Sequence, residues 1–269
     1  MAALNSLRPA VAAVRRNPLL VALVGLFGLV QLPQFALQPS QPLLAAVVSL
    51  GITGALLVVM PFFQGGLLGM ANEALDGRTG LGTLVAEGKR NYVSLLIAYL
   101  AVFAANAVIG SVVLFAVVLG VAGGYAGGGA PDVVLLGAAG AVGLLFLLAY
   151  FLVAFFVQFY AHAIVLGDAG VVAGFRRSVG LVRRNLTSVL GYTLVLLVGS
   201  LVLGGVGGVA SFLLSPQPTG ISLPVPELST PLLIGTAIVY VASLAVLGAL
   251  YATYSVSFYR AIEGTTLRA

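Results

Sequence analysis

The sequence has no cysteine, no tryptophan, a single histidine and very few charges. Of its 269 residues only 7% are charged and 61% are hydrophobic, and the mean hydropathy is +1.16. A soluble globular domain carries about 25% charged residues, and a disordered chain needs low hydrophobicity and many charges. Both classes are therefore excluded. The composition is typical of a protein embedded in a membrane.

These absences also exclude several kinds of chemistry. Without cysteine the chain has no disulfide, no thiolate nucleophile and no cysteine-ligated metal. One imidazole, that of His162, cannot build a zinc site without further ligands nearby. Neither Gly-x-Ser-x-Gly nor His-Glu-x-x-His occurs, and the seven acidic residues all stand in loops or at the ends of apolar segments. We therefore expect a protein that is not an enzyme, with no catalytic residues, no cofactor and no metal.

Six apolar segments are each long enough to cross a membrane. About 20 residues rising roughly 1.5 Å each span a hydrocarbon core of about 30 Å. No segment carries a charge in its interior, where insertion would cost about 2.5 to 3.5 kcal/mol. The segments are Leu19–Leu37, Leu43–Ala71, Tyr92–Val121, Val133–Leu166, Thr187–Leu214 and Leu232–Tyr259. The sequence thus predicts an all-α fold, a polytopic bundle of six transmembrane helices in one membrane domain over residues 1–269.

The connections between these segments differ sharply in charge. All twelve basic residues lie before the first segment, after the last, or in the second and fourth connections, and the other three connections have none. The positive-inside rule then predicts that both termini are cytoplasmic. Only Lys89 is lysine, an arginine bias typical of GC-rich genomes, so we expect the cytoplasmic membrane of a prokaryote. The net charge of +5 reflects topology, and we expect the bilayer rather than nucleic acid as the partner.

Two basic residues followed by asparagine occur three times, each time just before an odd-numbered span. The asparagines are Asn17, Asn91 and Asn185. Apolar residues precede them at offsets of 13, 10, 6 and 3, the spacing of one helical face, most clearly in the outer two copies. We predict three repeated hairpins, approximately 1–71, 78–166 and 169–259, each preceded by a cytoplasmic amphipathic helix at the membrane interface. The alternative, a cleaved signal peptide at Arg15-Arg16, is disfavoured because Asn17-Pro18 and five more spans follow.

The third copy carries a family resemblance. Its segment from Gly174 to Asn185 resembles the pattern Ala-Leu-x-x-Ser-x-x-Leu-x-Arg-x-Asn, which Ser178, Leu181, Arg183 and Asn185 match, whereas Gly174 and Phe175 depart from it. This pattern is found in uncharacterised six-helix prokaryotic membrane proteins similar to the membrane domain of some glycerophosphodiester phosphodiesterases. The catalytic domain of those enzymes has no counterpart here. The resemblance therefore implies a membrane protein of unknown function and no phosphodiesterase activity.

Two groups of residues are candidate sites. The first is a basic collar that could bind anionic lipid headgroups, because cations near a negative leaflet are attracted to it. Its members are Arg8, Arg15, Arg16, Lys89, Arg90, Arg176, Arg177, Arg183 and Arg184. The second is an intramembrane polar group, whose members could line a solute path or only stabilise helix packing. It comprises Gln64, Asn106, Gln158 and His162.

Small residues at four-residue spacing point to close helix packing. The pairs are Gly65 with Gly69, Gly120 with Gly124, and Gly204 with Gly208. In lipid, small residues let helix backbones approach and gain van der Waals contact. Taken together, the sequence favours a non-enzymatic membrane protein that acts as a scaffold or associates with lipid. The alternative is a small-solute transporter or facilitator, which a shared cavity lined by the polar group would favour.

Overall fold

The computed structural model describes residues 2–30, 42–125, 132–214 and 230–266, and every regular element in those ranges is a helix. Four helices precede the third predicted span: α1 (Ala2–Asn5), α2 (Leu7–Arg16), α3 (Pro18–Leu29) and α5 (Pro42–Asp76). Six follow: α6 (Leu81–Tyr125), α7 (Val133–Val157), α8 (Tyr160–Gly167), α9 (Val171–Arg184), α10 (Leu186–Leu214) and α11 (Thr230–Thr266). The predicted all-α fold is confirmed.

Five stretches are long and apolar enough to cross a membrane. They are Ala46–Asp76, Leu81–Gly124, Val133–Gly167, Leu186–Ala210 and Pro231–Gly264. The segment Ala2–Arg16 and α3 form a pair bent by 84°, and they add a sixth span only if the pair is counted as one. Of the first predicted span, residues 31–37 lie outside the described residues. Of the other five predicted spans, four each fall within one helix, and Val133–Leu166 is divided between α7 and α8.

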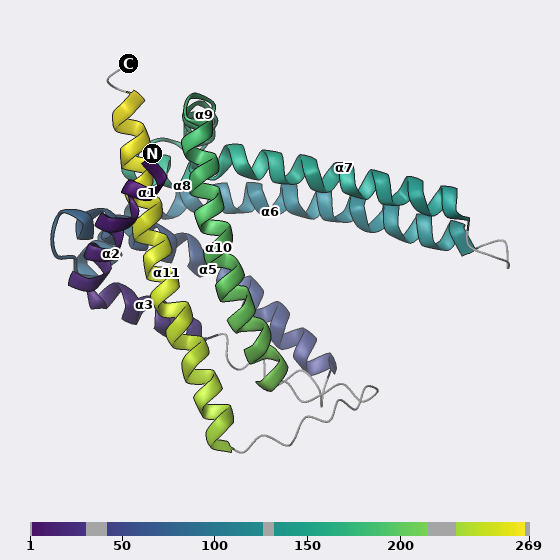
Figure 1. Ribbon diagram of the computed structural model, residues 1–269, viewed down its shortest axis with the longest axis horizontal. Coiled ribbons are helices and arrows are strands. Elements are labelled where there is room, and N and C mark those ends of the chain that lie inside the picture. Colours follow the sequence, from purple (N-terminus) through teal and green to yellow (C-terminus); the bar gives the residue numbers. More distant parts are fainter. Residues whose placement is uncertain (1, 31–41, 126–131, 215–229, 267–269) are drawn as a thin grey trace.

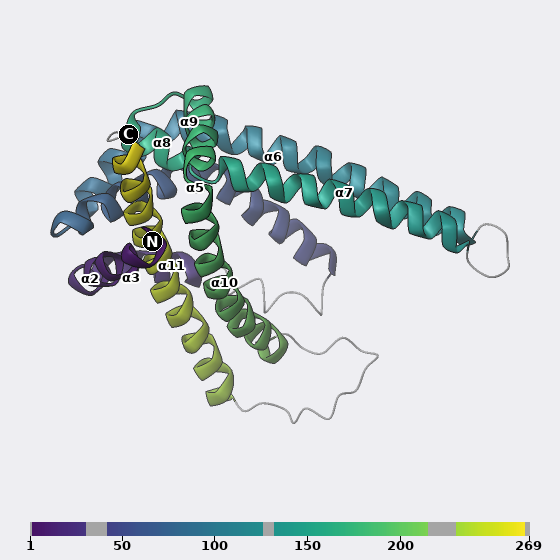
Figure 2. The same cartoon turned by 45° about the horizontal axis from the view of Figure 1, so that its top comes forward.

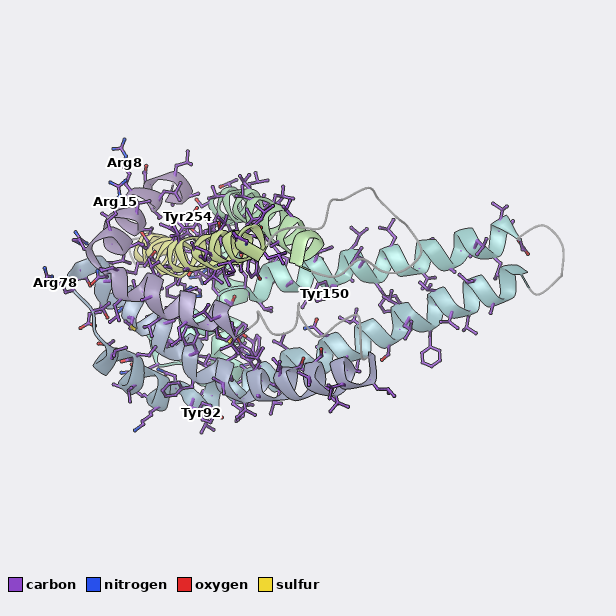
Figure 3. The ribbon with its side chains drawn as sticks, turned by 90° about the horizontal axis from the view of Figure 1, so that it is seen from below. Arg8, Arg15, Arg78, Tyr92, Tyr150 and Tyr254 are labelled. Atoms are coloured by element: carbon purple, nitrogen blue, oxygen red, sulfur yellow. The ribbon has the colours of Figure 1, made fainter. Side chains whose placement is uncertain are left out.

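The helices diverge from one compact end. In Figures 1 and 2, α1, α2, α8 and α9 gather where one end each of α5, α6, α10 and α11 also lies. From there α6 and α7 extend together in one direction, while α10 and α11 extend in another. We call this compact end the basic end, because it holds the described arginines from Arg8 to Arg260. Figure 3 shows Arg8, Arg15 and Arg78 there.

The buried core sits at the basic end. One cluster surrounds Phe159 and Tyr192, a second joins Leu68 to Leu95, and a third joins Leu20 to Met70. Farther along the helices the apolar side chains are exposed; Phe115 in α6, for example, is 67% exposed. Exposed apolar surface along a long helix is what a hydrocarbon surrounding requires.

Glycines mark where helices approach closely. A Cβ on Gly65 would lie 3.0 Å from the Leu95 side chain of α6, and one on Gly124 would lie 2.9 Å from Leu136 of α7. The predicted packing role of the pairs Gly65/Gly69 and Gly120/Gly124 is therefore confirmed. A Cβ on Gly204 or Gly208 would meet no described residue within 4 Å, so the third pair makes no such contact in the part of the chain that the structure describes.

The pairing of helices differs from a set of three separate hairpins. The α6–α7 and α10–α11 pairs are neighbours, as Figure 1 shows. In contrast, α3 packs mainly along α11, where a Cβ on Gly25 would lie 3.2 Å from that of Ala245. Meanwhile α5 packs along α6 of the next copy. The helices thus contact one another across the predicted repeat boundaries at 71–78 and 166–169.

One helix boundary also differs from the expectation. The segment predicted to be the middle amphipathic helix is the start of α6 and continues into the long apolar helix, whereas α2 and α9 are separate helices. In the first copy Pro18 follows Asn17, and a proline disfavours helical geometry in the residue before it; Asn17 indeed has φ −126° and ψ 71°. The middle copy has Tyr92 in that position and its helix continues.

The fourth span is interrupted between α7 and α8. Ser178 of α9 lies at the break with its side chain buried. Its hydroxyl donates to the carbonyl of Phe156, 2.9 Å away, and accepts from the backbone N–H of Phe159, 3.0 Å away. The serine therefore satisfies two backbone groups that the interruption frees, which non-helical backbone in a membrane protein requires.

Candidate functional site

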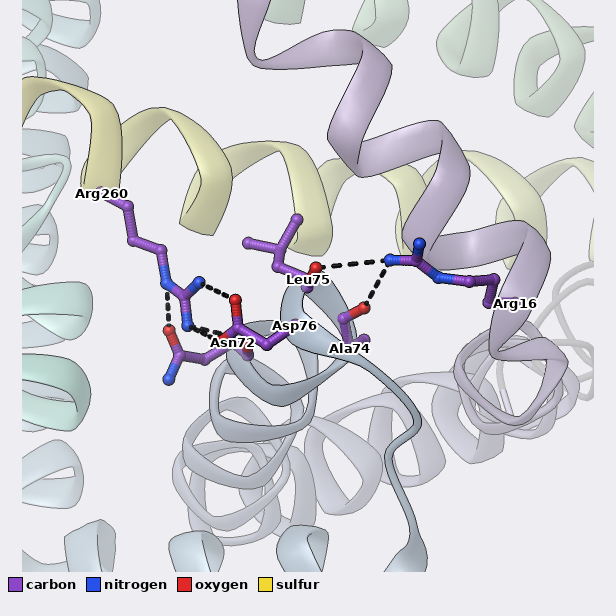
Figure 4. Close-up of polar contacts among 6 residues, drawn as sticks. All are labelled: Arg16, Asn72, Ala74, Leu75, Asp76 and Arg260. Carbon is purple, nitrogen blue, oxygen red and sulfur yellow. Dashed lines mark hydrogen bonds and ion pairs between the residues drawn. The ribbon is translucent and has the colours of Figure 1, made fainter.

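The collar residues divide into those that contact protein groups and those that have no hydrogen bond or ion pair among the described residues. Arg16 of α2 donates to the carbonyls of Ala74 and Leu75, 3.4 and 3.3 Å away, at the last turn of α5 (Figure 4). The last carbonyls of a helix lack intrahelical donors and carry partial negative charge. Arg16 supplies both a donor and a positive charge, and so it joins the N-terminal segment to α5.

Arg260 of α11 holds the same turn from the other side, as Figure 4 shows. Its guanidinium donates to both carboxylate oxygens of Asp76, at 2.9 and 2.8 Å, and to the side-chain oxygen of Asn72 at 2.7 Å. It also donates to the Asn72 carbonyl at 2.9 Å. The sequence analysis did not select Arg260 as a site residue, although Asn72 and Asp76 lie four residues apart on one helical face, a spacing that suits a shared partner.

Two further collar arginines hold the C-terminal end of α8. Arg90 donates to the Val165 carbonyl at 3.2 Å and lies 2.8 Å from the carboxylate of Glu87 and 3.4 Å from that of Asp168. Arg177 lies against the Gly167 carbonyl and pairs with Glu263 of α11. Arg16, Arg90 and Arg177 therefore contact protein groups, which leaves them less available to lipid.

The other six collar residues are exposed, and none makes a hydrogen bond or ion pair within the described residues. They are Arg8, Arg15, Lys89, Arg176, Arg183 and Arg184. One of them, Arg183, lies 6.0 Å from the centre of the Phe156 ring, within the range of a cation–π contact. Six of the nine collar residues thus have positive charges that no described protein group neutralises, and the other three contact the protein.

The three repeated asparagines make the same bond. The side-chain nitrogen of each donates to the backbone carbonyl four residues earlier: Asn17 to Ala13 at 2.9 Å, Asn91 to Glu87 at 3.0 Å and Asn185 to Leu181 at 3.0 Å. Asn17 additionally contacts the loop before α6, donating to Gly77 and accepting from the N–H of Thr79. All three asparagines therefore bind a backbone carbonyl one helical turn earlier, and Asn17 also links its segment to the loop before α6.

The four intramembrane polar residues occupy three separate places. Asn106 and Gln158 line one cavity of about 330 Å³ between α6 and α7, together with Tyr150 and Tyr160. His162 is buried, and its Nε2 lies 2.9 Å from the Ser255 hydroxyl of α11. Neither His162 nor Gln64 lines that cavity. Of the four residues, only Asn106 and Gln158 therefore share a cavity among the described residues.

Aromatic rings surround His162. The ring centre of Phe159 lies 5.7 Å from that of His162, and the Tyr259 ring stacks on the imidazole at 5.5 Å. Tyr192 and Phe258 stack beside them at 4.4 Å. This packing makes His162 part of a core with the Ser255 hydroxyl as its polar partner. Among the described residues no three His, Asp or Glu side chains gather where they could hold a metal ion.

Comparison with known proteins assigns a family. The model of a domain of unknown function, DUF7847, matches residues 1–262. The chain belongs to the DUF7847 family. No curated protein sequence and no solved structure matches it. In this DUF7847 chain the matched region includes every collar residue and all four intramembrane polar residues, so both candidate sites lie within the family domain.

Proposed function

We propose that this protein is a non-enzymatic, lipid-associated membrane protein of six spans that binds anionic headgroups through the exposed residues of its basic collar. The observation that supports this most directly is the set of six exposed collar residues at the basic end that make no hydrogen bond or ion pair with the described part of the chain. Cations beside an anionic leaflet each contribute about 1 kcal/mol to binding, an attraction that salt screens. A scaffold held at an anionic membrane surface would use the same charges.

The proposal includes three related units with amphipathic helices at the interface. The identical asparagine bonds support the relation between the copies. A second support is that the apolar stripe changes from exposed to buried in the same direction in the first and third copies. Leu4 and Val172, at the first position of the stripe, are 57% and 65% exposed, whereas Val14 and Val182, at its last position, are buried. One end of each stripe packs on the core and the other remains open to acyl chains.

The proposed orientation places both termini and the loops near Arg78 and Arg176 in the cytoplasm of a prokaryote. Because the chain has no native cysteine, a single introduced cysteine is the only labelling site. We expect Gly127→Cys, outside the described residues, to react with a membrane-impermeant maleimide added to intact cells. Gly180→Cys in α9, where a Cβ meets nothing within 4 Å, should react only after the membrane is opened. The reverse pattern would contradict the topology.

Substitutions of two neighbouring arginines of α9, Arg176 and Arg177, can distinguish a role in lipid binding from a role in helix packing. We expect Arg176→Gln, which removes an exposed charge without a described partner, to weaken retention of anionic lipid about fivefold while the melting temperature in detergent stays unchanged. Arg177→Gln should lower the melting temperature, because it breaks the contact with Glu263. Native mass spectrometry and thermal unfolding measure the two effects. Equal lipid retention by the wild type and Arg176→Gln would count against the collar.

The alternative function, a small-solute facilitator, has a narrower basis. It rests on the cavity shared by Asn106 and Gln158. The Gln158 side chain already donates to the Phe155 carbonyl at 2.8 Å, so one of its hydrogen-bonding groups is occupied within its own helix. A solute path would need further polar groups along its length. We therefore favour the lipid-associated function.

A further inference from the structure

A groove between α2, α10 and α11 opens beside two of the unpaired arginines. Its volume is about 370 Å³, within the range of about 300 to 1,000 Å³ that ligand pockets occupy. The walls are almost entirely apolar, with Leu7 and Val11 from α2, Gly199 and Leu203 from α10, and Leu247 and Tyr254 from α11. Such a groove suits a hydrocarbon chain.

The arginines stand next to the groove wall. Val11 follows Arg8 by three residues and precedes Arg15 by four, so both arginines neighbour Val11 on the surface of α2. Figure 3 shows Arg8 and Arg15 on the outer side of α2, close to one another and directed away from the bundle. Neither has a hydrogen bond or ion pair within the described part of the chain. The helix that forms one wall of the groove therefore carries two free cations on its outer side.

The groove also holds a polar group that lacks a partner. Tyr254 lines it and is 3% exposed, and its hydroxyl has no hydrogen bond among the described residues. A buried hydroxyl ordinarily has a partner, so this one is a donor for which a ligand could provide the acceptor. The ester carbonyl of a glycerolipid is such an acceptor.

Along α11 the groove lining runs from a hydroxyl to apolar side chains. From Tyr254 to Leu247 the helix runs away from the basic end by seven residues, or about 10 Å. Arg8 and Arg15 lie at the basic end, the hydroxyl lies on the side of the groove nearer to that end, and the leucines lie beyond it, which matches the order of headgroup, ester and acyl chain in a phospholipid. We propose that this groove binds one acyl chain of an anionic phospholipid whose phosphate lies at Arg8 and Arg15. The proposal rests on the collar function above and names one site within it.

The test uses the full chain in detergent with phosphatidylglycerol and phosphatidylcholine of identical acyl chains. Gly199→Phe should fill the groove without a clash, because a Cβ there meets nothing within 4 Å. We expect it to weaken binding of both lipids at least fivefold. Gly204→Phe, on the same helix, equally unobstructed and outside the groove, is the matched control and should bind as the wild type does. Native mass spectrometry counts the retained lipids.

The headgroup is tested separately. Arg8→Gln combined with Arg15→Gln should reduce phosphatidylglycerol affinity ~25-fold, from about fivefold for each arginine, and remove the preference over phosphatidylcholine. If the wild type retains both lipids equally while Gly199→Phe weakens both, the collar function is wrong and the groove binds chains alone. If only the arginine variant weakens binding, the groove is wrong. Displacement of the lipid by millimolar inorganic phosphate would also overturn it, because the site would then bind a free anion.

A fluorescent side chain in the groove gives an independent measurement of lipid binding that does not require the Gly199→Phe variant. The chain has no native tryptophan, so Leu203→Trp introduces the only indole, which can be excited at wavelengths that the ten tyrosines do not absorb. Val198→Trp, on the same helix, 62% exposed and outside the groove, is its control. Phosphatidylglycerol with brominated acyl chains should quench Leu203→Trp with saturation at one lipid per protein. Quenching of the two variants to the same extent would overturn the assignment.

Discussion

Phe159→Ala is expected to lower the free energy of unfolding by about 3 kcal/mol. Phe159 is fully buried, and its ring lies within 5.4 to 6.2 Å of the rings of Tyr192, Phe258 and Tyr259. It therefore joins the break between α7 and α8 to both α10 and α11. Removing a buried phenylalanine ring costs about 3 to 5 kcal/mol. The lower value applies because an unfolded helix in detergent still keeps its apolar side chains away from water.

Phe151→Ala is the matched control for this prediction. Phe151 lies two turns earlier in α7 and is 59% exposed, so its removal leaves no cavity. Its effect should stay within about 0.5 kcal/mol. Unfolding in a titration of a denaturing detergent, followed by circular dichroism, measures both variants. Similar stabilities for the two variants would show that the aromatic core at the basic end does not stabilise the fold.

Gly66→Ala is expected to destabilise the α5–α6 contact by about 2 kcal/mol. A Cβ at Gly66 would overlap the backbone carbonyl oxygen of Leu84 in α6, and it would lie 2.7 Å from a methyl carbon of the same leucine. Because a backbone group cannot rotate away, the two helices must separate. Overpacking of this kind costs about 1 to 3 kcal/mol.

Gly54→Ala is the control in the same helix. A Cβ at Gly54 meets nothing within 4 Å, and alanine has a higher helix propensity than glycine by up to about 1 kcal/mol. This variant should therefore be as stable as the wild type or slightly more stable. The same detergent titration compares the two. A Gly66→Ala protein as stable as Gly54→Ala would contradict the close approach of α5 and α6.

Part of the candidate site could be read from the residue pattern. The repeated asparagines were identified by their position after two basic residues, and the structure places each in the same local bond. A bond to the carbonyl four residues earlier is local, so similar sequences produce similar geometry. The pairing of Arg260 with Asn72 and Asp76 joins residues 184 and 188 positions apart, and no local pattern predicts such a partner.

The sequence by itself determined the helical class, five of the spans and the asymmetry of the basic residues, because chain length, hydrophobicity and charge act one segment at a time. Tertiary structure alone decided which collar arginines are free. Arg176 and Arg177 are adjacent, yet only Arg177 reaches Glu263. It likewise decided that α3 packs on α11 and that His162 lies apart from the cavity of Asn106 and Gln158. In lipid all the spans are similarly apolar, so hydrophobicity does not select helix partners; close fit at small residues and polar bonds between distant segments do.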